Sequence, residues 1–251
     1  MSNTIRNDVT MKATVTAPTM QQSGPTTTST RKTAVLVGLL FLTATVTFLI
    51  ADALIIGVLD RPDYLTGASA DATALTTGAL LAFVDGIAIV GIAVLLFPLL
   101  KRHSEPLALA YVGFRVAELA AILLYLATPL LVIKLGNGLL EGTVDASASQ
   151  QLGALFQAQH SVSIVMVYLF TGVAGAILAF LLYRSRLIPR SIAILGVIGY
   201  PVLLVGSILA MFNLVDLTQG LGLIALVPGG LFELILPIWL IARGFTFPSH
   251  D

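Results

Sequence analysis

The stretch LALAYVGFRVAELAAILLYLATPLLVI, residues 107–133, decides the fold. It is a continuous apolar run that contains two charged residues, Arg115 and Glu118. A helix needs roughly 20 residues, at about 1.5 Å each, to cross a hydrocarbon core of about 30 Å. The run is long enough, and it lacks the two-residue alternation that a strand of a membrane barrel shows. We therefore predict a transmembrane helix over 107–133 that carries two charges inside the bilayer.

Five further apolar runs of the same kind accompany this one. The chain has 251 residues, of which 57% are hydrophobic and only 10% are charged, whereas soluble domains carry about 25% charged residues. Too few polar side chains remain to cover a water-soluble globule. The sequence predicts an all-α polytopic membrane protein, a bundle of six transmembrane helices in a lipid bilayer. The other five spans are expected at 34–58, 78–100, 158–183, 190–212 and 221–242.

The N-terminal region differs in composition from the rest of the chain. Residues 1–32 are rich in Thr, Ser, Gln and Pro and show no hydrophobic periodicity. Such a segment buries too little apolar surface to order itself, so we predict a disordered tail over 1–32 and a transmembrane domain over 33–245. The stretch SASQQLGALFQAQH, residues 147–160, is expected to form an interfacial helix that leads into the fourth span.

The distribution of Lys and Arg predicts the orientation in the membrane. Ten of these residues fall in the tail, in or directly after the connections 101–106 and 184–189, and at the C-terminus, whereas the other side has only Arg61 and Lys134. Because basic residues mark the cytoplasmic side, both termini are predicted to be cytoplasmic in a multi-pass protein of the cell membrane. The longer connections, 59–77 and 134–157, are then external.

Composition also excludes several classes of function. Thirteen basic residues balance thirteen acidic ones, and no basic cluster predicts a nucleic-acid partner. The absence of cysteine excludes thiolate nucleophiles and cysteine-ligated metals. No HExxH or GxSxG motif is present. We therefore expect no metal, no cofactor and no catalytic residue, and an intramembrane enzyme is the least favoured class. The sequence leaves the oligomeric state open.

Ionisable residues inside the predicted spans are the main functional signal. Arg115 and Glu118 are three residues apart, so their side chains share one helix face and can pair. A lone charge near the middle of the bilayer costs about 2.5–3.5 kcal/mol on insertion scales, and pairing offsets much of that cost. The full set of predicted buried ionisable residues is Asp52, Asp85, Arg115, Glu118 and Glu233.

Two interpretations of these residues stay open. With all five ionised, one cation would face four anions, so we expect a protonated carboxylate, a bound cation or a water-filled cavity. In the functional interpretation, Arg115, Glu118 and Glu233 form the floor of a site for a small polar ligand, proton or cation, in a transporter-like or sensor-like protein. That site would open to the outer side past Asp52, Asp85 and His160. In the structural interpretation, the buried charges only fix helix packing.

Four stretches of the sequence resemble one known family. They are YVGFRVAELAA (111–121), FQAQH (156–160), LLYRSRLIPRSIAILGVIGYPVLL (181–204) and GGLFELILPIWLIARGF (229–245). Together they resemble the bacterial six-helix membrane family called domain of unknown function 4386. The resemblance covers roughly residues 33–245 and matches its Arg and Glu spacing at Arg115 and Glu118. It implies an integral inner-membrane protein and supplies no activity.

Overall fold

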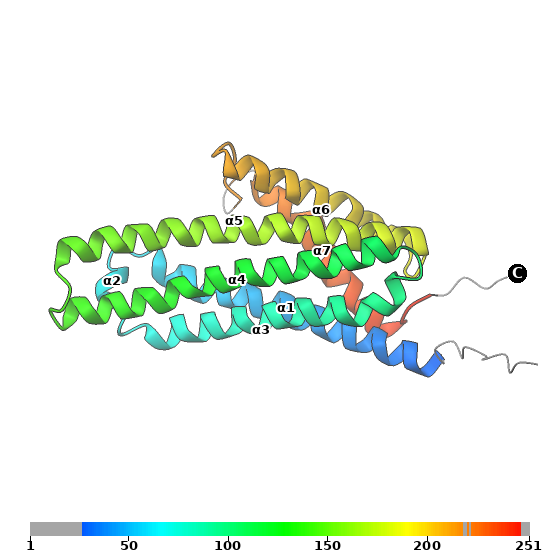
Figure 1. The fold of residues 1–251 in the computed structure, drawn as a ribbon, viewed down its shortest axis with the longest axis horizontal. Coiled ribbons are helices and arrows are strands. Elements are labelled where there is room, and N and C mark those ends of the chain that lie inside the picture. The colour runs from blue at the N-terminus through cyan, green and yellow to red at the C-terminus, as the bar shows by residue number, and fades with distance from the viewer. Residues whose placement is uncertain (1–26, 218–219, 221, 247–251) are drawn as a thin grey trace, which may run out of the picture.

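Helices make up almost all of the computed structural model, which describes residues 27–217, 220 and 222–246. Within these residues there is no strand, and the six long helices are each apolar enough to cross a membrane. The predicted all-α bundle of six spans is confirmed. Figure 1 labels the helices α1 (Thr27–Leu59), α2 (Tyr64–Gly67), α3 (Ala72–Leu100), α4 (Glu105–Leu140), α5 (Ala146–Ser185), α6 (Arg190–Met211) and α7 (Gly222–Ala242).

Four helices (α1, α3, α4 and α5) are longer than the apolar runs that predicted them, and α4 and α5 extend furthest beyond those runs. Helices α4 and α5 have 36 and 40 residues, hence lengths of about 54 and 60 Å against a hydrocarbon core of about 30 Å. The stretch 147–160 is therefore not a separate interfacial helix, because it forms the first turns of α5. Asp145 caps this helix by accepting a hydrogen bond from the backbone N–H of Ala148 at 2.9 Å. Of the predicted tail, residues 1–26 lie outside the described residues, and 27–32 belong to α1.

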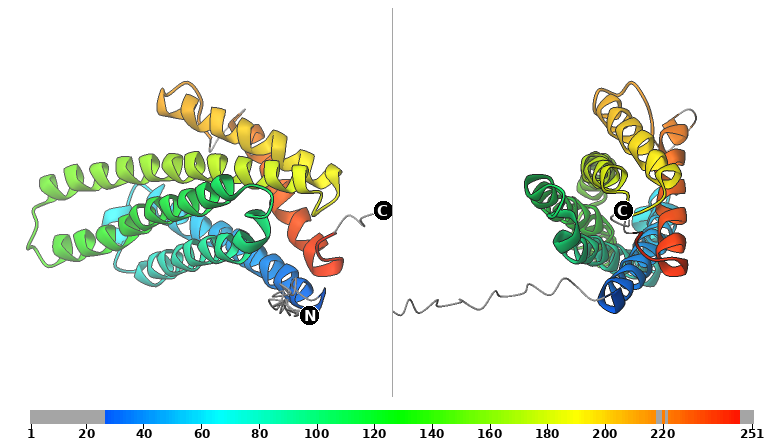
Figure 2. Two further views of the ribbon diagram at one scale, coloured as in Figure 1. Left: turned by 45° about the vertical axis from the view of Figure 1, so that its right-hand side comes forward. Right: turned by 90° about the vertical axis from the view of Figure 1, so that its right-hand side faces the viewer.

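The six long helices form a closed ring in chain order. Each packs mainly against its two neighbours in the sequence, and α7 completes the ring by packing against α1. The start of α1 and the end of α7 lie at the same end of the bundle, which we call the termini end (Figure 1). The opposite end, which carries α2, is called the loop end. Viewed along the bundle in Figure 2, α7 (red) lies beside α1 (blue), across from α4 (green).

Glycines allow the last three helices to approach closely. A Cβ at Gly175 of α5 would overlap the ring of Tyr200 of α6, and a Cβ at Gly199 would overlap the backbone of α7 at Gly229. Small residues at such crossings let membrane helices pack backbone to backbone. These contacts fix the position of Tyr200 between α5 and α7.

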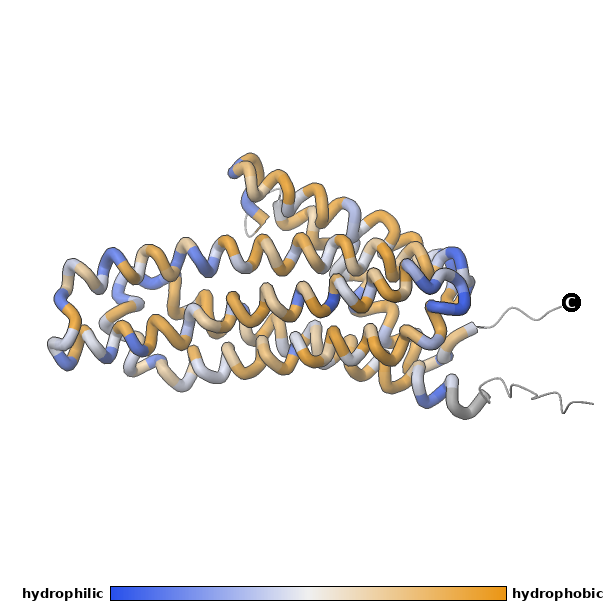
Figure 3. The backbone as a smooth tube through the Cα atoms, viewed as in Figure 1, coloured by the Kyte–Doolittle hydropathy of each residue, from blue (hydrophilic) through white to orange (hydrophobic). Residues whose placement is uncertain are grey.

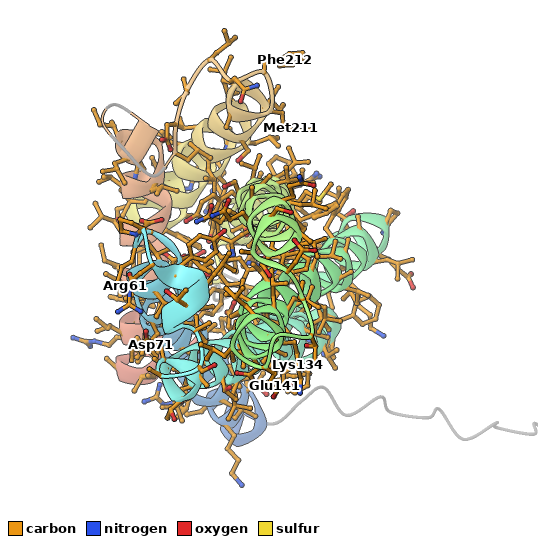
Figure 4. All side chains as sticks on the ribbon, turned by 90° about the vertical axis from the view of Figure 1, so that its left-hand side faces the viewer. Arg61, Asp71, Lys134, Glu141, Met211 and Phe212 are labelled. Atoms are coloured by element: carbon orange, nitrogen blue, oxygen red, sulfur yellow. The ribbon has the colours of Figure 1, made fainter. Side chains whose placement is uncertain are left out.

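Polar residues gather at both ends of the bundle, as the hydropathy colouring in Figure 3 shows. At the loop end, Arg61 and Asp71 form an ion pair within the connection between α1 and α3 (Figure 4). Lys134 and Glu141 lie at the same end of α4. At the termini end, the guanidinium of Arg31 donates hydrogen bonds to the last carbonyls of α7. Between these ends the buried core consists of two apolar clusters, one toward each end.

Candidate functional site: an intramembrane cavity with four charged residues

A cavity of about 250 Å³ lies where the two apolar clusters meet. All six long helices contribute to its wall. The wall is mostly apolar and includes the aromatic rings of Phe41, Phe48 and Tyr168. Its polar residues, however, include most of the charge buried in the bundle. They are Thr45, Asp85, Arg115, Glu118, Tyr168, Thr171, Tyr200 and Glu233.

Arg115 and Glu118 form the predicted ion pair. The Nη1 of Arg115 donates to Oε2 of Glu118 at 2.7 Å, and the two residues are only 2% and 4% exposed. The other carboxylate oxygen, Oε1, accepts a hydrogen bond of 2.6 Å from the hydroxyl of Thr171 on α5. The guanidinium also lies 5.5 Å from the ring centre of Tyr111, one turn earlier on α4, within the range of a cation–π contact. Each carboxylate oxygen of Glu118 thus accepts a hydrogen bond, one from Arg115 and one from Thr171.

Glu233 lies on α7 at the same cavity. Its Oε1 accepts a hydrogen bond of 3.0 Å from the hydroxyl of Tyr200 on α6. Glu233 is one helical turn after Gly229, the residue at which α7 crosses α6. The carbonyl of Glu233 lacks the usual helical hydrogen bond from four residues on, because Pro237 has no N–H. Glu233 is partly exposed, whereas Asp85, Arg115 and Glu118 are buried.

Asp85 of α3 is the third carboxylic acid at the cavity. It is buried, and it forms no hydrogen bond or ion pair with any residue that the structure describes. One guanidinium therefore faces three carboxyl groups, of which it pairs with one. The cavity carries an excess of acidic groups in a region with little water to screen them.

The structure divides the predicted set of site residues into two groups. Asp85, Arg115, Glu118 and Glu233 line the cavity, whereas Asp52 and His160 are not among its lining residues. Asp52 accepts a hydrogen bond of 2.8 Å from Tyr125, whose ring lies 4.6 Å from that of His160. Tyr125 follows Glu118 by seven residues on α4, about 10 Å nearer the loop end.

The cavity reaches the outside of the bundle between α1 and α7. Its lining residues there are exposed: Leu49 by 61% and Leu234 by 44%, and Gly230 is exposed as well. Leu49, Gly230 and Leu234 define an opening between α1 and α7, which differs from the predicted opening past Asp52 and His160. The difference arises because α1 and α7 meet at the termini end and leave the cavity uncovered further along.

The sequence analysis did not identify the two residues that donate hydrogen bonds to the cavity glutamates from neighbouring helices, Thr171 and Tyr200. Thr171 had a recognisable place on the small-residue face with Gly175, but that pattern predicts helix packing and not a hydrogen bond to a buried Glu. Tyr200 had no local signal, since its role depends on a contact between two helices. Within the described residues, no group of three or more His, Asp or Glu side chains is arranged to hold a metal ion.

The length and apolar composition of the six long helices are those of a multi-pass integral membrane protein. The chain belongs to the family described as Domain of unknown function (DUF4386), whose sequence profile matches residues 36–244. No curated protein and no solved structure matches the chain. The family assignment confirms the resemblance and supplies no activity.

Proposed function

We propose that the protein binds a small cationic ligand in the intramembrane cavity, as a transporter or a sensor does. The observation that carries this proposal is the uneven charge of the cavity. Arg115 pairs with Glu118 at 2.7 Å, and within the described residues the cavity holds no second cation for Asp85 or Glu233. Uncompensated carboxylates inside a membrane are costly unless they are protonated or face a cation. A small cation would supply the missing charge.

Calorimetry on the purified protein in phosphatidylcholine nanodiscs tests this proposal with three probes of similar size. We expect heat of binding from ethylammonium and none from ethanol or acetate. Asp85→Asn should weaken ethylammonium binding by about tenfold or more, since it removes an acceptor charge worth at least about 1.4 kcal/mol. Glu141→Gln, which removes an exposed carboxylate outside the cavity, is the matched control and should change nothing. Equal binding of ethanol and ethylammonium would reject the proposal.

A second candidate function is purely structural, and one observation favours it. Two hydrogen bonds at the cavity join neighbouring helices, α4 to α5 through Glu118 and Thr171, and α6 to α7 through Tyr200 and Glu233. Such bonds between membrane helices contribute about 0.6 kcal/mol each on average. Asp85 does not fit this account, because it bonds to no described neighbour. If Asp85→Asn leaves both stability and cation binding unchanged, the structural account is the better one.

A further inference from the structure

We infer that the ligand is a single-chain amphiphilic amine, whose ammonium group lies among Asp85, Glu118 and Glu233 and whose apolar chain leaves the cavity between α1 and α7 into the lipid. This inference rests on the proposed function and adds to it the chemical class of the ligand and the side from which it enters. Three features of the cavity carry it: the position of the acidic groups, the divergence of α1 from α7, and the apolar rim.

The acidic groups determine the charge of the ligand head. Three carboxyl groups and one guanidinium share the cavity wall, and the guanidinium is already paired with Glu118. An anionic head would face two further carboxyl groups, whereas an ammonium would complement them. The rings of Phe48 and Tyr168 also line the wall, and aromatic faces attract organic cations.

Helices α1 and α7 contact each other at the termini end and then diverge. Arg31 donates to the carbonyls of Leu240 and Ile241 at 3.0 and 2.7 Å. A Cβ at Gly38 would lie 2.9 Å from the carbonyl oxygen of Pro237, so the two backbones nearly touch there. Figures 1 and 2 show the two helices crossing at this end and separating toward the other.

The cavity opens where this separation has developed. From the Gly38–Pro237 contact, seven residues along each helix, about 10 Å, lead to Thr45 on α1 and Gly230 on α7, both of which line the cavity. Leu49 and Leu234 lie on the same rim and are exposed. Since this side of the bundle faces lipid and not water, the opening suits a hydrocarbon chain.

The size of the cavity supports the same assignment. A volume of about 250 Å³ is below the range of about 300–1,000 Å³ that is usual for pockets enclosing drug-sized ligands. The cavity therefore has room for an ammonium head and a short part of a chain. Glu233 is partly exposed and lies between Gly230 and Leu234 on α7, so an ammonium entering from the lipid would meet it first.

Gly230 lies at the opening and can take a side chain without a clash at its Cβ. A Cβ there would have no neighbour within 4 Å, and the same holds for Gly113, which is exposed on α4 away from the cavity. Gly230→Leu places a side chain at the rim, and Gly113→Leu is the matched control. The test uses calorimetry in phosphatidylcholine nanodiscs with ethyl-, butyl- and octylammonium and with octanoate. Heat from nanodiscs with the Asp85→Asn/Glu233→Gln variant corrects for partition into lipid.

We expect octylammonium to bind about tenfold or more tightly than ethylammonium, since its chain adds apolar contact. Gly230→Leu should weaken the binding of octylammonium by about tenfold and that of ethylammonium by less than about twofold. Gly113→Leu should change the affinity for neither compound. Octanoate should not bind. If the affinity is independent of chain length, or if Gly230→Leu has no effect on it, the inference fails. Binding of ethylammonium would in that case still support the proposed function. If no ammonium binds, both fail.

Discussion

The hydroxyl of Tyr200 lies 3.0 Å from Oε1 of Glu233 and donates a hydrogen bond that joins α6 to α7 at the cavity. The ring of Tyr200 lies against Gly175 of α5. One side chain thus connects three helices, through its ring on one side and its hydroxyl on the other. The two contributions can be separated by substitution.

Tyr200→Phe removes the hydroxyl and leaves the ring. We expect a loss of about 0.5–1.5 kcal/mol in the free energy of unfolding, the range for one hydrogen bond in a membrane protein or a soluble one. Equilibrium unfolding in mixed micelles measures it. Tyr183→Phe is the control, because Tyr183 is exposed and its hydroxyl has no hydrogen bond to any described residue. Equal losses for the two variants would contradict the assigned contact.

Gly175→Ala tests the other side of Tyr200. The added methyl group would overlap the Tyr200 ring, and overpacking of this kind costs about 1–3 kcal/mol. At Gly113 the same change meets open space, so it should be neutral, or stabilising by up to about 1 kcal/mol through better helix propensity. The two variants are compared by thermal melting in the same detergent. A Gly175→Ala protein as stable as Gly113→Ala would show that the contact between α5 and α6 leaves room for a methyl group.

The sequence predicted the six spans because the thickness and polarity of the bilayer set the length and hydropathy of each run, independently of contacts with other helices. It also predicted the Arg115–Glu118 pair, since two residues three apart on a helix must be neighbours. It could not predict that Asp52 and His160 lie apart from the cavity. Whether a residue faces the cavity depends on how its helix is rotated and shifted against the next one. The glycines that set this packing contact residues on other helices, so their effect cannot be read from the local sequence.

The same limit applies to the helix ends. The sequence predicted a helix over 147–160 and a span over 158–183, but not that the two form one continuous helix, α5. The cap at Asp145 was a local signal for the true start of the helix. The contact between Arg31 and the end of α7 spans more than 200 residues of sequence and has no local signal.

That contact leads to a prediction about the α1–α7 pair. Arg31 donates to the carbonyls of Leu240 and Ile241 in the last turn of α7, where carbonyls lose their partners within the helix. The carbonyl of Leu240 also accepts a hydrogen bond from the backbone N–H of Gly244. Arg31→Gln should therefore lower the free energy of unfolding by about 1–2 kcal/mol. Lys32→Gln removes the same charge from an exposed neighbour and serves as the control. Equal effects of the two substitutions would point to net charge as the cause.

Orientation in the membrane gives a further prediction. The ten-to-two distribution of Lys and Arg predicts that both termini are cytoplasmic. A reporter fused after residue 140, at the loop end of α4, should be external, and one fused after Asp251 should be internal. A reporter that is active only outside the cytoplasm, paired with one that is active only inside, makes the test independent of expression level. The reverse pattern would place the loop end in the cytoplasm.

The last prediction concerns the cation of the cavity. Arg115→Ala leaves Asp85, Glu118 and Glu233 facing one another without a guanidinium, whereas Glu118→Ala leaves Arg115 with two other carboxyl groups in the same cavity. Removing one partner of a buried pair costs about 3–5 kcal/mol in soluble proteins. We expect Arg115→Ala to approach that loss in unfolding experiments and Glu118→Ala to lose clearly less.

The pH dependence of the two variants separates charge from packing. Protonation removes the repulsion among the carboxyl groups that Arg115→Ala leaves behind, so the stability deficit of that variant should shrink as the pH is lowered. Arg115→Met, which keeps much of the side-chain volume, should show the same pH dependence with less loss of packing. If the deficits of Arg115→Ala and Glu118→Ala are equal at every pH, Arg115 is a packing residue and the charge imbalance has no energetic consequence.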